Sequence, residues 1–241
     1  MPTPALHDCR LLSVGAAPEP GLRAPVRLLS LEMPDCFHFE AGQYLEIALP
    51  EGSIPLSIAS APWRLPRLEL HYRSTPGAPE AAQLDTLLEH AGTSTTTLLK
   101  VRGPLGSVRL SPPLTQPLLL IAGGTGAAQA MSIIDTLTRQ VPVFPVTLLW
   151  CADEPDDFYL EPALRALDAA WLELQLIADA ERSDANRGLD WLRRNAARFA
   201  GTQVVLAGSP AFVYRVCDLL ETQGVPLAAL RSDVFDYAPR S

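Results

Sequence analysis

The fifteen residues Leu118–Ser132, reading LLLIAGGTGAAQAMS, constrain the fold of this 241-residue chain most strongly. An apolar run of five residues meets three glycines within four positions, and helix-forming residues follow as far as Leu137. The run is too short to span a membrane and suits a buried parallel strand. A strand, a glycine turn and a helix in this order can bind an anion, because glycines let backbone N–H groups approach it and the helix N-terminus is partly positive. Glycine turns also end strands for steric reasons alone, so the rest of the chain must decide whether this is a nucleotide site.

Downstream of this stretch, short apolar runs alternate with helical patterns. The expected strands are Leu118–Ala122, Val146–Cys151, Glu173–Ala178 and Val204–Leu206, and the expected helices are Ala127–Gln140, Glu161–Ala170, Asp190–Ala200 and Ala211–Gln223. Such alternation forms a parallel sheet with right-handed crossovers, and cofactors bind at the carboxyl ends of its strands. The C-terminal half is therefore expected to be an α/β domain.

The N-terminal half consists of short runs separated by proline, glycine and acidic turns. The expected strands are Leu11–Val14, Val26–Leu31, Tyr44–Leu49, Leu56–Ser60, Leu68–Arg73 and Leu98–Val101, with one helix over Ala78–His90. Regular short strands of this kind form an antiparallel sandwich or barrel. The prolines between Leu110 and Pro117 exclude a central strand or helix there. We therefore predict an α+β chain of two domains, antiparallel over residues 1–110 and parallel over residues 111–241.

Composition limits the partners and the compartment. A formal charge of −8 and a pI near 5.0 argue against nucleic acid or an anionic membrane as the main partner. The cysteines at positions 9, 36, 151 and 217 lack CxxC spacing, so we expect mostly buried thiols and no zinc or iron–sulfur site. The N-terminus lacks the pattern of a signal peptide, and no apolar run reaches membrane-spanning length. These features predict a cytoplasmic protein that binds neither nucleic acid nor membrane.

Four segments occur in an order that is more specific than any one of them. They are Phe39–Leu45 (FEAGQYL), Ile54–Pro62 (IPLSIASAP), Arg102–Gly106 (RGPLG) and the glycine turn, which Leu206–Pro210 (LAGSP) follows at a later strand end. With these segments the chain resembles, over nearly its whole length, the NAD(P)H:flavin oxidoreductases of the ferredoxin–NADP reductase superfamily, particularly the small bacterial flavin reductases. The resemblance implies a flavin-binding antiparallel β-barrel followed by a domain that binds NADH or NADPH. The flavin would be FAD, FMN or riboflavin.

The resemblance also implies roles for individual positions. The Ser57 hydroxyl would lie beside N5 of the flavin and hydrogen-bond there as a hydride arrives. A serine at a strand end can also simply satisfy backbone groups. Either Phe235 or Tyr237 would stack near the rings. The implied cofactor-binding residues are Pro55, Leu56, Ser57, Ile58, Tyr72, Arg73, Ser74, Gly103 and Gly106 for the flavin, Gly123, Gly124, Thr125, Gly126, Asp153, Gly208, Ser209 and Pro210 for the dinucleotide, and Phe235 beside the rings.

Two places depart from the family pattern. Ile54 stands where the family has an arginine that neutralises the flavin phosphate, and an apolar side chain cannot form that charge-assisted pair. We therefore expect flavin to bind weakly and to leave once reduced. NADP-selective relatives have serine and arginine after the third strand of the dinucleotide domain, where this chain reads ADAER (178–182). Carboxylates there and at Asp153 accept from a ribose 2′-hydroxyl and repel a 2′-phosphate, which predicts a preference for NADH, although Arg182 offers a phosphate partner.

Three further polar features have simpler interpretations. His71 lies on an alternating strand and is expected to be a surface or packing residue rather than a base. The acidic run Asp153–Asp157 lacks the spacing of a calcium-binding loop and is expected to be solvated. Cys151 follows a strand near the expected cleft and is interpreted as a buried thiol.

The sequence therefore predicts an oxidoreductase that passes a hydride from NADH or NADPH to a flavin. One alternative is a reductase that retains its flavin and delivers electrons to a protein partner such as an oxygenase; the sequence holds no ferredoxin-type cysteine cluster. The other alternative is a degenerate nucleotide-binding module, which the isoleucine at position 54 motivates.

Overall fold

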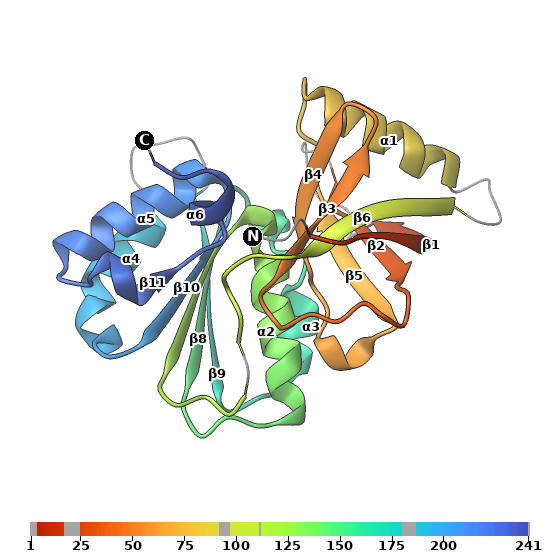
Figure 1. Cartoon of the computed structure of the whole chain (residues 1–241). Coiled ribbons are helices and arrows are strands. Elements are labelled where there is room, and N and C mark those ends of the chain that lie inside the picture. Colours follow the sequence, from red (N-terminus) through yellow and green to blue (C-terminus); the bar gives the residue numbers. More distant parts are fainter. Residues whose placement is uncertain (1–3, 17–24, 92–96, 111, 180–186, 241) are drawn as a thin grey trace.

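Two β-sheets, one antiparallel and one parallel, lie side by side in this computed structural model (Figure 1). The structure describes residues 4–16, 25–91, 97–110, 112–179 and 187–240. Ser111, at the expected domain boundary, lies outside the described residues, as do Glu181 and Arg182 of the segment expected to select NADH.

The N-terminal sheet has six antiparallel strands in the order β4-β3-β6-β1-β2-β5. They are β1 (Leu6–Ala16), β2 (Arg27–Glu32), β3 (Tyr44–Leu49), β4 (Gly52–Ser57), β5 (Arg67–Tyr72) and β6 (Thr97–Leu105). The outer strands β4 and β5 approach each other through an isolated antiparallel bridge between Ile58 and Leu70. The sheet thus curls into a barrel that is joined over one short edge. Alternate side chains fill its interior, and helix α1 (Pro79–Ala91) adds Leu84 and Leu88 to that core.

The C-terminal sheet has five strands in the order β11-β10-β7-β8-β9, and all neighbouring pairs are parallel. Its strands are β7 (Leu118–Gly123), β8 (Val146–Ala152), β9 (Leu172–Ala178), β10 (Gln203–Ala207) and β11 (Leu230–Arg231). The α-helices are α2 (Ala127–Arg139), α3 (Glu161–Ala166), α4 (Arg187–Asn195), α5 (Pro210–Thr222) and α6 (Val234–Tyr237). Single 3₁₀ turns are η1 (Pro62–Arg64), η2 (Gly124–Gly126), η3 (Pro155–Asp157), η4 (Ala196–Phe199) and η5 (Leu227–Ala229).

Helices cover both faces of the parallel sheet (Figure 1). Leu118 and Leu120 of β7 belong to an apolar cluster with α2 and α3, whereas Leu119 and Ile121 belong to a second cluster with α4 and α5. A strand that is buried on both faces must be apolar at every position, which explains the uninterrupted LLLIA run.

The two sheets share one apolar cluster. Val26, Ala41, Val108 and Leu110 from the N-terminal part pack in the same cluster as residues of β7, β8 and α2. The halves of the molecule are therefore joined by core packing as well as by the polar contacts described below.

The structure confirms the predicted fold class and corrects three details. The expected strand Leu56–Ser60 is instead β4 at Gly52–Ser57, because Pro55 is tolerated on a strand at the end of the sheet order. The expected helix Glu161–Ala170 ends at Ala166, since Asp168 has a left-handed φ of 44°. The short elements β11 and α6 were not predicted.

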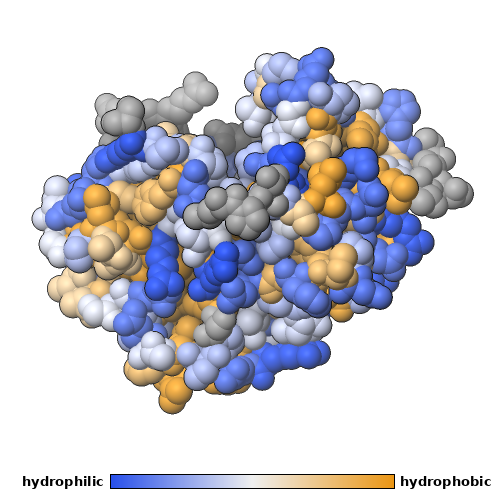
Figure 2. Space-filling view, viewed as in Figure 1, coloured by the Kyte–Doolittle hydropathy of each residue, from blue (hydrophilic) through white to orange (hydrophobic). Residues whose placement is uncertain are grey.

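Hydrophilic residues cover most of the face shown in Figure 2, and hydrophobic residues form small groups among them. Cys36 is exposed, whereas Cys9, Cys151 and Cys217 are buried. Within the described ranges, no helix is both long enough and apolar enough to cross a membrane.

Candidate functional site

A cavity of about 260 Å³ lies where the barrel meets the carboxyl ends of the parallel strands. This volume is slightly below the roughly 300–1,000 Å³ of typical small-molecule sites, so it suits reactive rings rather than a whole dinucleotide. Some of its lining residues were singled out from the sequence, namely Pro55, Leu56, Ser57, Thr125, Gly126, Gly208, Ser209 and Tyr237. Segments far apart in the chain thus converge on one space.

The barrel side of the cavity is formed by the end of β4. Pro55, Leu56 and Ser57 line it, and Ser57 pairs in register with Tyr44 on β3, which also lines it. Ile58, the next residue, is fully buried in the barrel core and does not line the cavity. The Ser57 hydroxyl is therefore the first polar side chain that this strand end offers to a ligand.

The opposite side is formed by two glycine turns. β7 and β10 are parallel neighbours, so the turns that follow them lie at the same edge of the sheet. A Cβ on Gly126 would come within 2.5 Å of the Ala207 backbone, and one on Gly123 within 2.7 Å of the Phe212 ring. Gly124 has a φ of +54°, a conformation that favours glycine. Gly123 and Gly126 therefore allow the close packing of the two turns, whereas Gly124 allows the backbone conformation of the first turn.

Several other residues that the resemblance assigned to the flavin lie outside the cavity lining and have protein partners. The Tyr72 hydroxyl donates to the carbonyl of Ala81, and the Ser74 hydroxyl donates to Asp85. Gly103 backs onto Leu45, where an added Cβ would lie 3.0 Å from that side chain.

Arg73 and the acidic run contact each other, which the sequence did not predict. Arg73 Nη2 donates to Asp157 Oδ1 at 2.6 Å, and the Asp157 side chain is only 3% exposed. The prediction of a solvated acidic loop holds for residues 153–156, which are exposed, and is wrong for Asp157. Arg73 Nε is buried and has no hydrogen-bond partner among the residues that the structure describes. Asp153 follows β8 and is exposed.

The C-terminal segment forms another part of the lining. Tyr237 lines the cavity and its ring meets that of Tyr44 edge-on, with centroids 6.0 Å apart. Phe235, in contrast, packs on Tyr214 at 5.9 Å and belongs to the core cluster beneath α5. Pro210 is the first residue of α5, and Ser209 caps that helix by accepting from the N–H of Phe212. Of the two aromatic candidates, Tyr237 is therefore the one that faces the cavity.

Asp233 is a buried carboxyl group in the cavity lining. It accepts from the backbone N–H of Val108 at 3.2 Å and from Gln129 Nε2 at 2.6 Å. Gly106, with a φ of +99°, lies so close that a Cβ there would come within 2.5 Å of the carboxyl group. Burial raises the pKa of Asp233 to about 7, and the charge of Asp236 adds to the increase, while the hydrogen bonds from Val108 and Gln129 oppose it.

Sequence reasoning quoted Tyr44, Ser232 and Asp233 only as members of family segments, interpreted His71 as a surface or packing residue, and missed Gln129, although all five line the cavity. No local motif marks them as a group, because each is brought to the cavity by tertiary packing. Gln129 could have been singled out from the sequence, because it is a long polar residue among the small apolar residues that begin α2.

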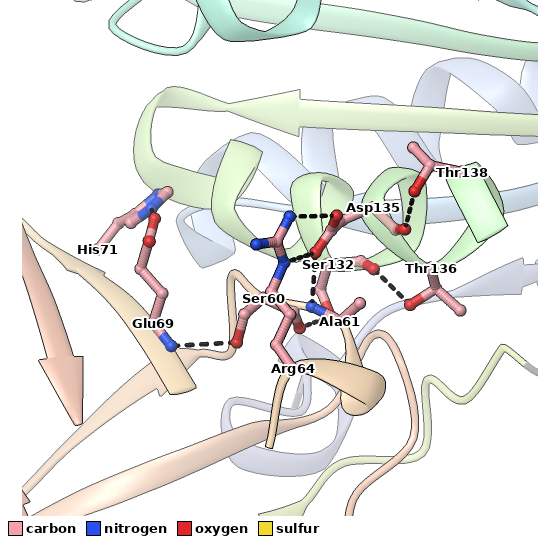
Figure 3. A network of polar contacts seen from close by, with 9 residues as sticks. All are labelled: Ser60, Ala61, Arg64, Glu69, His71, Ser132, Asp135, Thr136 and Thr138. Carbon is pink, nitrogen blue, oxygen red and sulfur yellow. Dashed lines mark hydrogen bonds and ion pairs between the residues drawn. The ribbon is translucent and has the colours of Figure 1, made fainter. Parts of the chain in front are cut away.

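A polar seam, formed by Ser60, Ala61 and Arg64 of the barrel with Ser132 and Asp135 of α2, joins the two halves (Figure 3). Arg64 donates to both carboxylate oxygens of Asp135, at 2.5 and 2.8 Å, and the N–H of Ala61 donates to the same carboxylate. The Ser132 hydroxyl donates to the carbonyl of Ser60. The two halves are therefore joined by directional hydrogen bonds as well as by core packing.

The residues present fit a flavin ring and a dinucleotide better than they fit a flavin phosphate. Flat apolar and aromatic groups, the Ser57 hydroxyl and the two glycine turns suit stacked rings and a pyrophosphate. Ile54, at the position of the expected arginine, is half-buried and packs on the barrel core. Its side chain offers no charge for a phosphate.

Comparison with known proteins supports this description. The model of the oxidoreductase NAD-binding domain family matches residues 120–218. The chain is 33% identical over 229 residues to the reductase component 1 of terephthalate 1,2-dioxygenase from a Comamonas species, which covers 90% of this chain and 66% of that protein. It is 30% identical over 155 residues to an NAD(P)H-flavin reductase from Vibrio harveyi, which covers 64% of this chain and 63% of that protein. The chain thus spans just under two thirds of the length of these relatives.

The fold has close structural counterparts. A ferredoxin–NADP⁺ reductase from Plasmodium falciparum aligns with a TM-score of 0.78 and 13% identity over 94% of this chain and 95% of that chain. The order of an antiparallel sheet followed by a parallel sheet, the glycine turns and the related sequences all support this similarity. The chain thus has the two-domain fold of ferredoxin–NADP⁺ reductases, and its C-terminal half matches the oxidoreductase NAD-binding domain family, as its motifs had indicated.

Proposed function

We propose that this protein transfers a hydride from NADH to a flavin in the cavity between the two sheets. The observation that carries the proposal is that one small cavity brings Ser57 together with the turns after β7 and β10. Hydride transfer needs nicotinamide C4 and flavin N5 to approach to about 3–3.5 Å, so stacking the rings and excluding water is the main task of the protein. Relatives that include flavin reductases support this reading.

In this proposal each side of the cavity binds one partner. Pro55, Leu56 and Ser57 form the flavin side, and Tyr237 covers it from the C-terminal segment. The turns at Gly123–Gly126 and Gly208–Pro210 bind the dinucleotide, since their glycines leave room for close approach of the backbone. Asp233 is an acidic residue in the described lining of the cavity.

The flavin is expected to act as a substrate that dissociates after reduction, because Ile54 replaces a phosphate-binding cation. The test is NADH oxidation by purified protein after extensive dialysis, with and without added riboflavin, FMN or FAD. Turnover should require added flavin. Stoichiometric flavin that survives dialysis would contradict weak binding while leaving the hydride transfer intact.

A second candidate is a reductase that passes electrons from its flavin to a protein partner. The observation that favours it is the similarity to dioxygenase reductase components over about 90% of this chain. In that case NADH oxidation would stay slow with free flavin and accelerate with a protein acceptor. A cytoplasmic location remains part of the proposal.

NADH is expected to be the preferred donor because exposed Asp153 lies directly after β8, at the edge of the sheet that holds the glycine turns. A carboxylate there repels a 2′-phosphate. Measured kcat/KM should favour NADH over NADPH, and Asp153→Asn should narrow the difference. A preference of the wild-type protein for NADPH would refute this assignment.

A further inference from the structure

His71 occupies an unexpected place in the fold. On β5, Leu68 and Leu70 point into the barrel, so alternation predicts that His71 points outward into solvent. Its side chain is nevertheless 0% exposed, because Tyr159 of the C-terminal half covers it. His71 also lines the cavity. It therefore stands where barrel, nucleotide domain and cavity meet.

Both ring nitrogens of His71 are engaged. Nε2 lies 2.7 Å from Glu69 Oε1, and Nδ1 lies 3.0 Å from the Tyr159 hydroxyl (Figure 3 shows the first pair). The hydrogen bond from His71 lowers the pKa of Glu69, so Glu69 is an ionised acceptor and Nε2 carries the proton. Burial raises the pKa of Tyr159, which keeps its hydroxyl protonated. In the neutral imidazole, Nδ1 accepts from that hydroxyl.

The Tyr159 ring leads directly to Trp150 on β8. Their rings meet edge-on with centroids 5.4 Å apart, and Phe158 packs on the same indole at 5.2 Å. Trp150 is fully buried, and its Nε1 donates to the carbonyl of Gly124 at 2.9 Å. A continuous set of contacts thus runs from Glu69 on the barrel to the glycine turn.

The hydrogen bond from Trp150 to the carbonyl of Gly124 determines where the N–H of Thr125 points. The carbonyl of Gly124 and the N–H of Thr125 belong to one planar trans peptide, so they point in opposite directions. An indole that holds this carbonyl, together with the N–H of Ala127, therefore aims the Thr125 N–H away from the core. Thr125 lines the cavity. Backbone N–H groups at such a turn are the donors that bind an anion.

We propose that Trp150, Tyr159 and His71 are positioning residues that hold the Gly124–Thr125 peptide in the orientation that binds the dinucleotide pyrophosphate. The inference rests on the proposed use of a dinucleotide at this turn and adds the residues that orient it. It also explains why a histidine and a tyrosine, one from each half of the molecule, are buried together. When the barrel packs against the parallel-sheet half, His71 and Tyr159 thus help to orient the glycine turn after β7.

The test measures binding of NADH and of ADP-ribose, which carries the pyrophosphate but no nicotinamide, by calorimetry. Trp150→Phe keeps an aromatic ring and removes the N–H, and should weaken ADP-ribose binding about fivefold to tenfold. His71→Leu should weaken it about threefold, and His71→Gln, which can still donate to Glu69 and accept from Tyr159, should restore most of the loss. Trp191→Phe is the matched control. Trp191 lies on α4 and its indole packs on Phe199, so this variant should leave binding unchanged.

Two readouts separate positioning from a general loss of structure. Hydrogen exchange at the amides of residues 123–126, measured without ligand, should accelerate in Trp150→Phe and His71→Leu but not in Trp191→Phe. In turnover assays the KM for NADH should rise, while kcat at saturating NADH and the KM for flavin stay at the wild-type value.

The results distinguish this inference from the proposed function. If wild-type protein binds ADP-ribose, and folded Trp150→Phe binds it as tightly as Trp191→Phe does, the inference is wrong and the proposed function stands. If wild-type protein binds neither ADP-ribose nor NADH, the proposed function fails and the inference fails with it. Should Trp150→Phe not fold, equal binding by His71→Leu and His71→Gln would overturn the inference.

Discussion

Ser57 is a small hydroxyl at a strand end, and its surroundings determine what it can do. The next residue turns into the barrel core, so Ser57 is the last side chain of β4 that meets the cavity. In the proposed function, a hydroxyl in this position would act by its dipole and its placement, so its contribution would be specific to the transfer step.

Replacing Ser57 with alanine should lower kcat for NADH-dependent flavin reduction by about tenfold to hundredfold, since the transfer step loses one oriented hydrogen bond. The free energy of unfolding should change by less than about 1 kcal/mol, as expected for a half-buried serine. Steady-state kinetics and urea unfolding check the two parts. Ser53→Ala on the same strand is the control, and equal kcat values for both variants would refute the role of Ser57.

The raised pKa of Asp233 predicts how the stability of the protein depends on pH. Its pKa is raised to about 7 in the folded chain, whereas an unfolded aspartate titrates near 3.9. The folded state therefore holds this proton more tightly, and the contribution of Asp233 to stability is complete below pH 4 and is lost as the pH rises to about 7.

Asp233→Asn removes this titration, so the variant should gain a few kcal/mol relative to the wild-type protein between pH 5 and pH 8. Urea unfolding of both proteins at the two pH values measures the difference. The lost contact with Gln129 is a constant offset that does not vary with pH. A difference in stability that is the same at both pH values would contradict the assignment.

At the residue scale, the sequence predicted what local motifs encode. Ser57 and the glycines lie next to strand ends that can be recognised from neighbouring residues. The sequence left open whether His71 is a surface or a packing residue, because the group that covers it, Tyr159, is 88 positions away in the chain. Asp157 was misjudged for the same reason, since its partner Arg73 comes from the other half.

At the scale of elements, the two glycine turns depend on how closely β7 and β10 pack. Gly126 is the N-cap residue of α2 and has helical backbone angles, so a larger residue there meets no conformational strain and only a steric obstacle. That obstacle is the backbone of Ala207, which cannot rotate out of the way.

Gly126→Ala should destabilise the protein by about 1–3 kcal/mol, as overpacking does, and should weaken NADH binding because the turns separate. Gly15→Ala is the control, since a Cβ there meets atoms no closer than 3.8 Å. Thermal unfolding and NADH titration measure both effects. If Gly126→Ala matches Gly15→Ala in both assays, the close packing of the turns has no functional consequence.

Most strands and helices could be predicted because the hydrophobic periodicity of a segment agrees with the glycines and prolines that bound it. The β7–α2 unit is an example, in which an apolar run, glycines and a helical pattern follow one another. The elements that were missed or shifted lack such agreement. β4 contains a proline that reads as a break, and β11 has only two residues, so tertiary pairing alone defines them.

For the whole molecule, the relation between the two halves is determined by the polar seam and the shared core. Asp135 is the central residue of the seam, with a side chain that is 7% exposed and three hydrogen bonds from the barrel. Arg64 is half exposed, so its charge stays hydrated when the pair is broken.

Asp135→Leu should therefore destabilise the protein by about 1–3 kcal/mol, because the N–H of Ala61 loses its acceptor in a buried place. Arg64→Met should cost less than about 1 kcal/mol, in the range of exposed ion pairs. Urea unfolding gives both values. Equal losses of stability in Arg64→Met and Asp135→Leu would contradict the central role of Asp135.

The core shared by Val26, Ala41, Val108 and Leu110 with the parallel sheet has a consequence for how such proteins recombine. A chimera that joins this barrel to another dinucleotide domain at the proline-rich connection would pair two surfaces that do not match. This would hold wherever in the connection the two sequences are joined. Compatibility is carried by these four side chains and by the polar seam rather than by the linker. Modules of this kind are therefore exchangeable in evolution only when the contact surface is inherited with them.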